Sequence, residues 1–363
     1  MSRPGRRTAS LILALLLAAA CRKQEAAPPG PMTLAVPAQG AYTGAFIEFG
    51  DTEDDVTLDG IEEFEKLVGK HQAIIASSSY WGEQSFPTAN VNLIFRHGSI
   101  PLIFWSPWNR PYQEDLGPDK FSLNNIADGK WDAYIDKWGE AAHAFGHPML
   151  VSFGNEMNGD WFPWSGGWYH GNQPVPGTKP AQYQGAELFK RAYRRVVDRV
   201  RAKGGANVLW VFHVMNYSYP QDGWNMASQY YPGPDYVDWL GLSVYGEQYM
   251  DDPWEENFAP LLDWPYDELC KLDPNKPIML TEWGIGEYPM HGNKAKFMKG
   301  AFEDMRTKTR LKAAIYWNER WENEDDSYSN LRVNSTVESL AVYRSCVGQP
   351  FWLGSPILAP RAK

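Results

Sequence analysis

From residue 41 onward, the chain alternates short apolar runs with longer amphipathic stretches, and loops rich in polar and aromatic residues separate the two. Within each run, β-branched and other apolar residues occupy successive positions rather than alternate ones. This pattern is typical of strands that are buried on both faces of a parallel sheet. Eight such runs are present, at residues 41–50, 72–81, 100–109, 148–158, 207–216, 237–246, 276–286 and 311–319.

The stretches between these runs carry helical patterns. Residues 58–70 place apolar side chains at a helical spacing, residues 131–146 and 186–205 each end in glycine as a capped helix does, and residues 337–346 form a last segment. Strands that alternate with helices predict an α/β fold, namely a single-domain (β/α)8 TIM barrel over residues 41–363. A doubly wound open sheet is the alternative, but it usually has fewer strands and a phosphate-binding loop after its first strand, and that loop is missing here.

The N-terminal residues have the composition of an export signal. Arg3, Arg6 and Arg7 precede an apolar run of ten residues, which is too short to span a bilayer as a mature helix. Ala18-Ala19-Ala20-Cys21 resembles the lipobox of bacterial lipoproteins. We therefore expect residues 1–21 to be a lipoprotein signal peptide, Cys21 to be the lipid anchor and residues 22–40 to be a Pro- and Ala-rich tether. The protein would then be exported and membrane-anchored, periplasmic or at the cell surface. Ordinary secretion is the alternative.

The composition narrows the class of ligand. The chain has 363 residues and a net charge of −10, which argues against a nucleic-acid partner because phosphate contacts need a basic face. Its 17 Trp and 19 Tyr favour flat surfaces for an uncharged ligand. Three cysteines are too few for a disulfide framework, and a bond between Cys270 and Cys346 stays open. No His and Asp cluster has the spacing of metal ligands, so we expect no metal or other cofactor, and a monomer.

Chemistry-bearing residues gather at the carboxyl ends of the predicted strands, where barrel enzymes place their active sites. Glu156 and Glu282 end strands that are three steps apart around the ring, so they would face each other across the barrel mouth. Glycoside hydrolysis requires two such carboxyl groups. Asn155 offers a neutral amide to a sugar hydroxyl, and Tyr245 lies where it can hydrogen-bond the nucleophilic carboxylate. A single Glu at a strand end is more often a salt-bridged loop residue, but the pair favours catalysis.

Other residues are weaker candidates. Glu319 lies beside the strand that carries Glu282 rather than opposite it, and Glu48 and Glu287 rank as substrate contacts or supporting groups. His213 ends a strand, and its entry into the site stays open. The acidic run 51–55 indicates a solvated loop, with a calcium or subsite role as the alternative. Indole rings suit sugar faces, with core packing as the alternative. The tryptophans expected to bind substrate are Trp105, Trp108, Trp161, Trp164 and Trp317.

The segment GNEMNGDWFPWSGG at 154–167 resembles glycoside hydrolase family 26, whose retaining (β/α)8 enzymes are best known as β-mannanases. The resemblance covers nearly all of residues 41–347, including the segment NLRVNSTVESLAVYR at 330–344. It implies that Glu156 is the acid/base and that Glu282, in Thr-Glu-Trp-Gly, is the nucleophile. It also implies that Trp161 lines the subsites, with Tyr245 and Trp317 around the reacting sugar.

One departure concerns the substrate. Familiar mannanases of this family often have His before the acid/base, whereas this chain has Asn155. The resemblance thus implies a retaining hydrolase of β-linked polysaccharide, foremost an endo-β-1,4-mannanase. A mixed-linkage β-glucanase or xylanase of the same family is the alternative. A non-catalytic cell-surface glycan-binding lipoprotein is the alternative of another class, and a transglycosylase would use the same residues.

Overall fold

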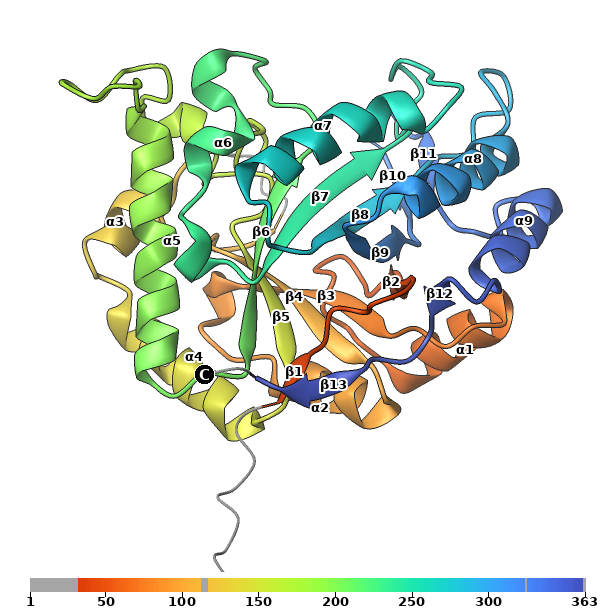
Figure 1. The fold of residues 1–363 in the computed structure, drawn as a ribbon, viewed down its shortest axis with the longest axis horizontal. Helices are drawn as coiled ribbons and strands as arrows, with labels where there is room; N and C mark the ends of the chain where they lie inside the picture. Colours follow the sequence, from red (N-terminus) through yellow and green to blue (C-terminus); the bar gives the residue numbers. More distant parts are fainter. Residues whose placement is uncertain (1–31, 112–116, 324, 362–363) are drawn as a thin grey trace, which may run out of the picture.

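The structure is a computed structural model that describes residues 32–111, 117–323 and 325–361. Eight parallel strands follow one another in chain order around a ring, and the first of them, β2, pairs with both β3 and β9 and so closes the barrel (Figure 1). The sequence-based prediction of a (β/α)8 barrel is confirmed. Each strand lies within one of the eight apolar runs: β2 Ala41–Phe46, β3 Ile74–Tyr80, β4 Ile100–Ser106, β5 Met149–Phe153, β6 Val208–Met215, β7 Trp239–Tyr245, β8 Ile278–Gly284 and β9 Leu311–Trp317.

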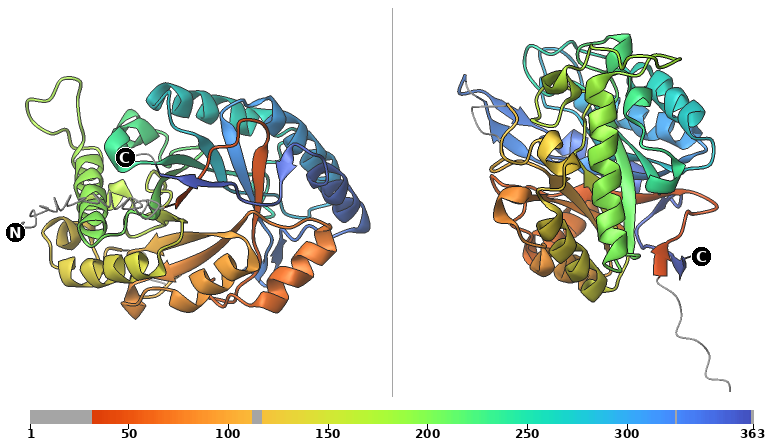
Figure 2. Two further views of the ribbon diagram at one scale, coloured as in Figure 1. Left: turned by 60° about the horizontal axis from the view of Figure 1, so that its bottom comes forward. Right: turned by 90° about the vertical axis from the view of Figure 1, so that its left-hand side faces the viewer.

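Helices cover the outside of the barrel (Figure 2). Four of them match the predicted amphipathic stretches: α1 Leu58–Val68, α4 Asp132–Phe145, α5 Gln184–Ala202 and α9 Val337–Val347. The sequence analysis did not specify α2 Thr88–His97, α3 Leu123–Ala127, α6 Ala227–Tyr230, α7 Ala259–Leu272 and α8 Lys294–Thr307. Single 3-10 turns lie at η1 Trp81–Glu83, η2 Gly166–Tyr169, η3 Gly223–Asn225 and η4 Pro234–Tyr236.

The ends of these helices follow from local chemistry. Thr57 precedes α1, and its hydroxyl accepts a hydrogen bond from the amide of Gly60 at 3.2 Å, which satisfies one of the free amides of the first turn. Gly69 ends the same helix at φ 70°, a left-handed conformation that a residue with a Cβ adopts only at a cost. Thr336 caps the start of α9 in the same way as Thr57.

Short strands close the face of the barrel opposite the carboxyl ends of the large strands. β1 Met32–Leu34 pairs with β13 Leu358–Pro360, and β12 Trp352–Leu353 extends the sheet beside β2. The hydroxyl of Tyr42, near the start of β2, donates to the carbonyl of Ala35 and accepts from the amide of Ile357. The two ends of the described chain therefore meet at this face. Residues 32–40, which were expected to belong to the tether, are in fact part of the folded body, because β1 pairs with β13 and Leu34 is buried. A hairpin of β10 Arg320–Glu322 and β11 Tyr328–Asn330 follows β9 at the carboxyl ends of the strands.

Three expectations concern targeting and covalent cross-links. The proposed signal peptide, with Cys21, lies outside the described residues. Among the described residues, no helix is both apolar and long enough to cross a membrane. Cys270 and Cys346 are both free thiols, which settles the question that the sequence left open.

Candidate active site

The structure brings Glu156 and Glu282 together at the carboxyl ends of the strands. Glu156 follows β5, and Glu282 lies on β8. A carboxylate oxygen of one lies within 4.8 Å of a carboxylate oxygen of the other, and both side chains are nearly buried, with 7% and 8% of the residue exposed. Two carboxyl groups thus share a small, poorly solvated space.

The backbone that presents Glu156 is strained. Its φ angle is 53°, in the left-handed region that residues other than glycine rarely adopt, and Gly154, two residues earlier, has φ 57°. The Glu156 amide donates to the carbonyl of His213 at 2.9 Å, and its own carbonyl accepts from the amide of Gly159 at 2.9 Å. Such a conformation costs on the order of 1–3 kcal/mol and persists only where surrounding contacts hold it, as these hydrogen bonds do.

Each carboxylate accepts a hydrogen bond from an aromatic side chain. The indole Nε1 of Trp161 donates to Oε2 of Glu156 at 3.0 Å, and the hydroxyl of Tyr245 donates to Oε2 of Glu282 at 2.8 Å. Burial raises the pKa of both carboxyl groups, and the negative charge of Glu156 raises the pKa of Glu282 further. The pair therefore holds one proton between its two members when other carboxyl groups of the protein have ionised.

His213 on β6 lies close to both acids, with a ring nitrogen within 4.8 Å of a carboxylate oxygen of each. Its Nδ1 lies 3.2 Å from the hydroxyl of Ser152, and its Nε2 lies 2.7 Å from the hydroxyl of Ser243 and 3.9 Å from Oε1 of Glu282. Burial lowers its pKa to about 3, so the ring is neutral. Ser243 also hydrogen-bonds Glu156 and has one proton to donate. If the Ser243 hydroxyl donates its proton to the carboxylate of Glu156, it can only accept from His213. The His213 ring then carries its proton on Nε2, donates it to Ser243 and accepts a hydrogen bond from Ser152 at Nδ1.

Two further carboxylates act through their charge, Glu53 on both members of the pair and Glu319 on Glu282. Glu53 raises the pKa of both Glu156 and Glu282, and it accepts a hydrogen bond from Ser78 at 2.5 Å. The acidic run 51–55 was expected to be a solvated loop, so this role of Glu53 was missed. Burial is the main cause that raises the pKa of Glu319 to about 8, and its Oε2 accepts from the indole of Trp317 at 2.7 Å. Five carboxylate or imidazole groups thus crowd one end of the barrel.

The remaining candidate acids are engaged in pairs of their own. Glu48 forms a two-point ion pair with Arg332, in which Nε donates to Oε2 at 2.6 Å. Glu287 accepts a hydrogen bond from the hydroxyl of Ser335 at 2.7 Å. Both acids therefore tie loops to the segment 330–344 that carried part of the family resemblance.

The expected polar and aromatic sugar contacts fall into different surroundings. Asn155 is 6% exposed, and its side-chain Oδ1 has no hydrogen-bond partner among the described residues. A buried acceptor without a partner is rare in proteins and suits a hydroxyl donor. Trp317 is stacked on Phe46 at 3.9 Å, so one face of its ring is covered. Trp108 is 7% exposed and lies edge-on to Phe162.

Two tryptophans do not have the role expected of them. Trp105 is fully buried and stacks on Trp138 of α4 at 4.1 Å, because side chains alternate along β4 and its neighbour Phe104 is the one that points toward His213. Trp164 is 1% exposed and stacks on Phe162 at 4.5 Å. Both rings pack in the core, so the expectation that they bind sugar is corrected.

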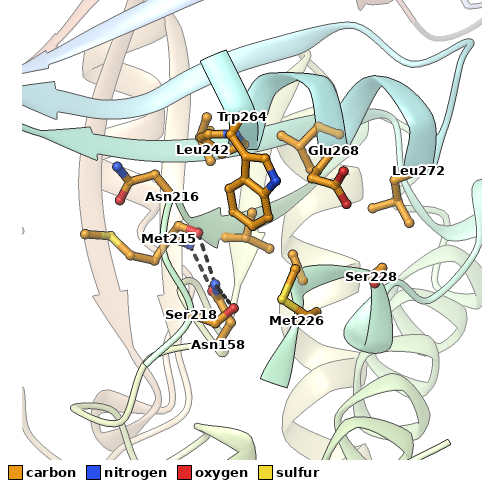
Figure 3. Close-up of a pocket in the computed structure, with 14 residues that line it drawn as sticks. Asn158, Met215, Asn216, Ser218, Met226, Ser228, Leu242, Trp264, Glu268 and Leu272 are labelled. Atoms are coloured by element: carbon orange, nitrogen blue, oxygen red, sulfur yellow. Dashed lines mark hydrogen bonds between the residues drawn. The ribbon is translucent and has the colours of Figure 1, made fainter. Parts of the chain in front are cut away.

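Asn158, two residues after Glu156, anchors the catalytic loop to β6. Its Oδ1 accepts from the amide of Met215 at 2.9 Å, and its Nδ2 donates to the carbonyl of Met215 at 3.0 Å (Figure 3). The pocket in that view lies between β6, β7 and α7, with Trp264 and Leu242 among its walls. Neither Glu156 nor Glu282 lines this pocket, so it is separate from the paired acids.

Two aromatic residues near the acids escaped the sequence analysis. Tyr249 follows β7, and its ring lies 6.1 Å from that of Trp321 on β10 in an edge-to-face arrangement. The charge of Glu156 contributes to the raised pKa of Tyr249, although burial is the larger cause. Nothing in the local sequence marks these two residues, because their place depends on how two loops fold over the barrel end.

Comparison with known proteins agrees with this geometry. Residues 125–331 match the model of glycosyl hydrolase family 26. Endoglucanase H of Acetivibrio thermocellus is 29% identical over 293 residues, and a mannan endo-1,4-beta-mannosidase of Bacillus subtilis is 24% identical over 249 residues. These alignments cover 79% and 67% of this chain. They span 29% and 58% of the two relatives, so each relative is longer than the part it shares with this chain.

Solved structures show the same fold. A Bacillus subtilis mannanase, man26, superposes with a TM-score of 0.59 at 19% identity, over 88% of this chain and 87% of that one. The catalytic domain of an endo-beta-1,4-mannanase from Bacillus sp. JAMB-750 gives a TM-score of 0.61 at 21% identity, over 86% of this chain and 87% of that one. The matched family model covers more than half of the chain, including both facing acids. The chain therefore belongs to glycosyl hydrolase family 26.

Proposed function

We propose that the protein is a retaining glycoside hydrolase that cleaves β-linked polysaccharides, with Glu156 as acid/base and Glu282 as nucleophile. The separation of the two carboxylates carries this proposal. Retaining enzymes keep these groups about 5–5.5 Å apart, whereas inverting enzymes need roughly 6.5–9.5 Å to admit a water molecule. An oxygen of Glu156 lies within 4.8 Å of an oxygen of Glu282, which is nearer to the retaining separation than to the inverting one.

In the first step, a carboxylate oxygen of Glu282 attacks the anomeric carbon as the glycosidic bond breaks. Glu156 gives its proton to the leaving oxygen, so the product of this step is a glycosyl ester on Glu282 and an ionised Glu156. In the second step, Glu156 takes a proton from water while the water oxygen attacks the anomeric carbon. The ester breaks, the sugar leaves with its β configuration, and Glu282 is ionised again.

The hydrogen bonds of the site support this division of roles. The ester formed in the first step removes the charge of Glu282, and with it the repulsion that holds the proton on the pair. The pKa of Glu156 then falls, as a group that must act as an acid and afterwards as a base requires. Tyr245 favours the ionised state of Glu282, because its hydroxyl donates to that carboxylate.

Substrate contacts are proposed from the same geometry. The unpartnered Oδ1 of Asn155 would accept a hydrogen bond from a hydroxyl of the sugar next to the broken bond. Trp161 and Trp317 would bind the same region through their rings, and Trp108 would support the loop of Trp161. Tyr249 and Trp321 would contact a more distant sugar.

For the substrate we propose a β-1,4-linked mannan cut at internal bonds. Two observations favour it, namely the similarity to the mannosidase of Bacillus subtilis and the likeness in fold to solved mannanases. A β-glucan is the second candidate, because the alignment with Endoglucanase H covers the larger part of this chain. Mannosyl and glucosyl units differ only in the orientation of the hydroxyl at C2. Reducing-sugar release from mannan, glucomannan, mixed-linkage glucan and xylan decides between them.

The catalytic roles are tested with Glu156→Ala and Glu282→Ala acting on an aryl β-glycoside with a good leaving group. Azide should restore turnover in both variants, giving the β-glycosyl azide with Glu156→Ala and the α-glycosyl azide with Glu282→Ala. Glu140→Ala, which removes an exposed carboxylate that pairs with Lys203 on the outer helices, is the control and should remain active. An α-configured first product from the unmodified enzyme would contradict retention. Turnover that survives both active-site variants would contradict the roles given to the two acids. Glycan binding without any turnover by the unmodified protein would favour a glycan-binding protein, and transfer to added sugars would reveal a transglycosylase.

We also propose that the mature protein is a monomeric lipoprotein held at a membrane through Cys21 alone. Labelling of cells with a fatty acid analogue should mark the wild-type protein and leave Cys21→Ser unlabelled. Equal labelling of both proteins, or none in either, would contradict the anchor.

A further inference from the structure

A second group of potential metal ligands lies at the end of the barrel opposite the paired acids. Glu65 belongs to the last turn of α1, His71 follows that helix, and His97 is the last residue of α2. Nδ1 of His71 lies 2.8 Å from Oε1 of Glu65, and Nε2 of His97 lies 3.1 Å from Oε2. The two imidazole rings are 4.9 Å apart, and one donor atom from each residue lies within 4.8 Å of the others.

We propose that Glu65, His71 and His97 bind a divalent transition-metal ion, with Zn²⁺ the expected occupant. Two imidazoles and a carboxylate are donors that Zn²⁺ accepts, at bond lengths of about 2.0–2.2 Å. In a tetrahedral site with such bonds, neighbouring donor atoms lie about 3.3 Å apart. The two separations between histidine and Glu65, 2.8 Å to Oε1 and 3.1 Å to Oε2, are short of that value by 0.2–0.5 Å, and the two imidazole donors lie within 4.8 Å of each other. Small side-chain rotations would admit the ion.

The carboxylate of this site is already oriented by the backbone. The amide of Gln72 donates to Oε1 of Glu65 at 2.8 Å. The side chain of Gln72 is itself fixed, because its Nε2 donates to the carbonyl of Lys70 at 2.8 Å and its Oε1 accepts from Thr43 at 3.0 Å. Hydrogen bonds that orient a ligand in this way commonly accompany metal sites and strengthen them.

The site is also accessible and well placed for a structural role. The side chains of Glu65 and His97 are 14% and 12% exposed, whereas that of His71 is 32% exposed, so solvent reaches the donors past His71. The three residues join α1, the loop before β3 and the end of α2, next to the starts of β3 and β4. An ion here would tie three segments together at the face that contributes stability rather than catalysis in such barrels.

The competing explanation is that Glu65 only accepts two imidazole hydrogen bonds. The two explanations differ in what added metal does. The experiment uses tag-free protein that has been treated with a chelator and dialysed, because an oligohistidine tag would bind the ion itself. Zn²⁺ is titrated by calorimetry, unfolding is followed with and without Zn²⁺, and Co²⁺ serves as a spectroscopic probe of four-coordinate geometry.

We expect one Zn²⁺ per chain and, at a hundredfold excess over the Kd, a rise in the unfolding midpoint of about 3–6 °C. Visible absorption typical of four-coordinate Co²⁺ should appear with the same stoichiometry. Glu65→Gln and His71→Gln should each abolish both effects of the metal. In the absence of metal, the unfolding midpoint of each variant should stay within a few degrees of that of the wild type. His143→Gln removes a histidine that does not belong to the cluster and whose ring bonds the carbonyl of Gly204, so this variant should bind Zn²⁺ like the wild type.

The catalytic end offers the only other such donor group among the described residues, namely Glu156, His213 and Glu282. Turnover measured during the titration therefore reports on the location of the ion. Saturation of the proposed site should leave turnover unchanged. The absence of saturable binding, or binding that survives both Glu65→Gln and His71→Gln, would overturn the proposal.

Discussion

The hydrogen bond from Tyr245 to Glu282 permits a quantitative test of how the paired acids share their proton. Tyr245→Phe removes one oxygen atom, whose hydrogen bond to Oε2 of Glu282 measures 2.8 Å, and leaves the ring in place. A hydrogen bond to a charged group contributes about 1.5–3 kcal/mol. Without it, the single proton of the pair shifts from Glu156 toward Glu282, which inactivates both residues at once. At 1.36 kcal/mol per decade, kcat/KM should fall roughly 10- to 150-fold.

The assay is kcat/KM across a full pH range. With a polysaccharide substrate, the loss should be uniform over the plateau, because a change of pH does not return a misplaced proton to Glu156. With an aryl glycoside whose leaving group needs no acid, the loss should shrink as the pH rises and Glu282 ionises. Tyr231→Phe is the matched control, since its hydroxyl donates to the carboxylate of Asp273 at 2.7 Å outside the site. An unchanged kcat/KM in Tyr245→Phe, or a loss confined to the acid limb with the polysaccharide, would refute the shared proton.

Two further predictions concern Glu319 and Gly159. Because the pKa of Glu319 is about 8 in the folded protein against 4.5 as the ordinary value, the folded state binds more protons between these values and stability falls as the pH rises through this window. Glu319→Gln should remove up to about 5 kcal/mol of this loss of folding stability. The variant should therefore have a higher unfolding midpoint than the wild type at pH 9 but not at pH 4. Equal shifts of the midpoint at both pH values would contradict this prediction. A Cβ at Gly159 would lie 2.5 Å from the indole of Trp161, so Gly159→Ala should displace the donor to Glu156 and lower kcat at least tenfold. Gly223→Ala, where a Cβ meets nothing within 4 Å, should retain wild-type kcat, and equal kcat in both variants would argue against the displacement.

The strands and the facing acids could be predicted because their signals are local. Each strand is an unbroken apolar run, and the position of Glu156 and Glu282 after or within such runs sets their place on the ring. Helix α7 was harder to recognise, since it contains Pro265, a residue that usually interrupts helices. Trp105 shows the limit of composition as a guide. Trp105 lies on the predicted strand. Side chains alternate between the two faces of a strand, however, and its ring points outward to Trp138.

Contacts between distant segments could not be predicted from one sequence. Glu53 reaches the paired acids from a loop that looks like any solvated acidic run. The group of Glu65, His71 and His97 has no recognisable ligand spacing along the chain, because it forms only when the ends of two helices come together. Ser243 is likewise an ordinary strand residue until the barrel closes and places it beside His213.

The pairing of β1 with β13 has a consequence for how the enzyme meets its substrate. Both ends of the described chain meet at β1 and β13, opposite the carboxyl ends of the barrel strands (Figure 1). Any support attached before Met32, whether a lipid, a resin or a fused partner, would hold the molecule by its base. An attachment at that point would leave the end that carries Glu156 and Glu282 unobstructed, so that a long polymer could reach it.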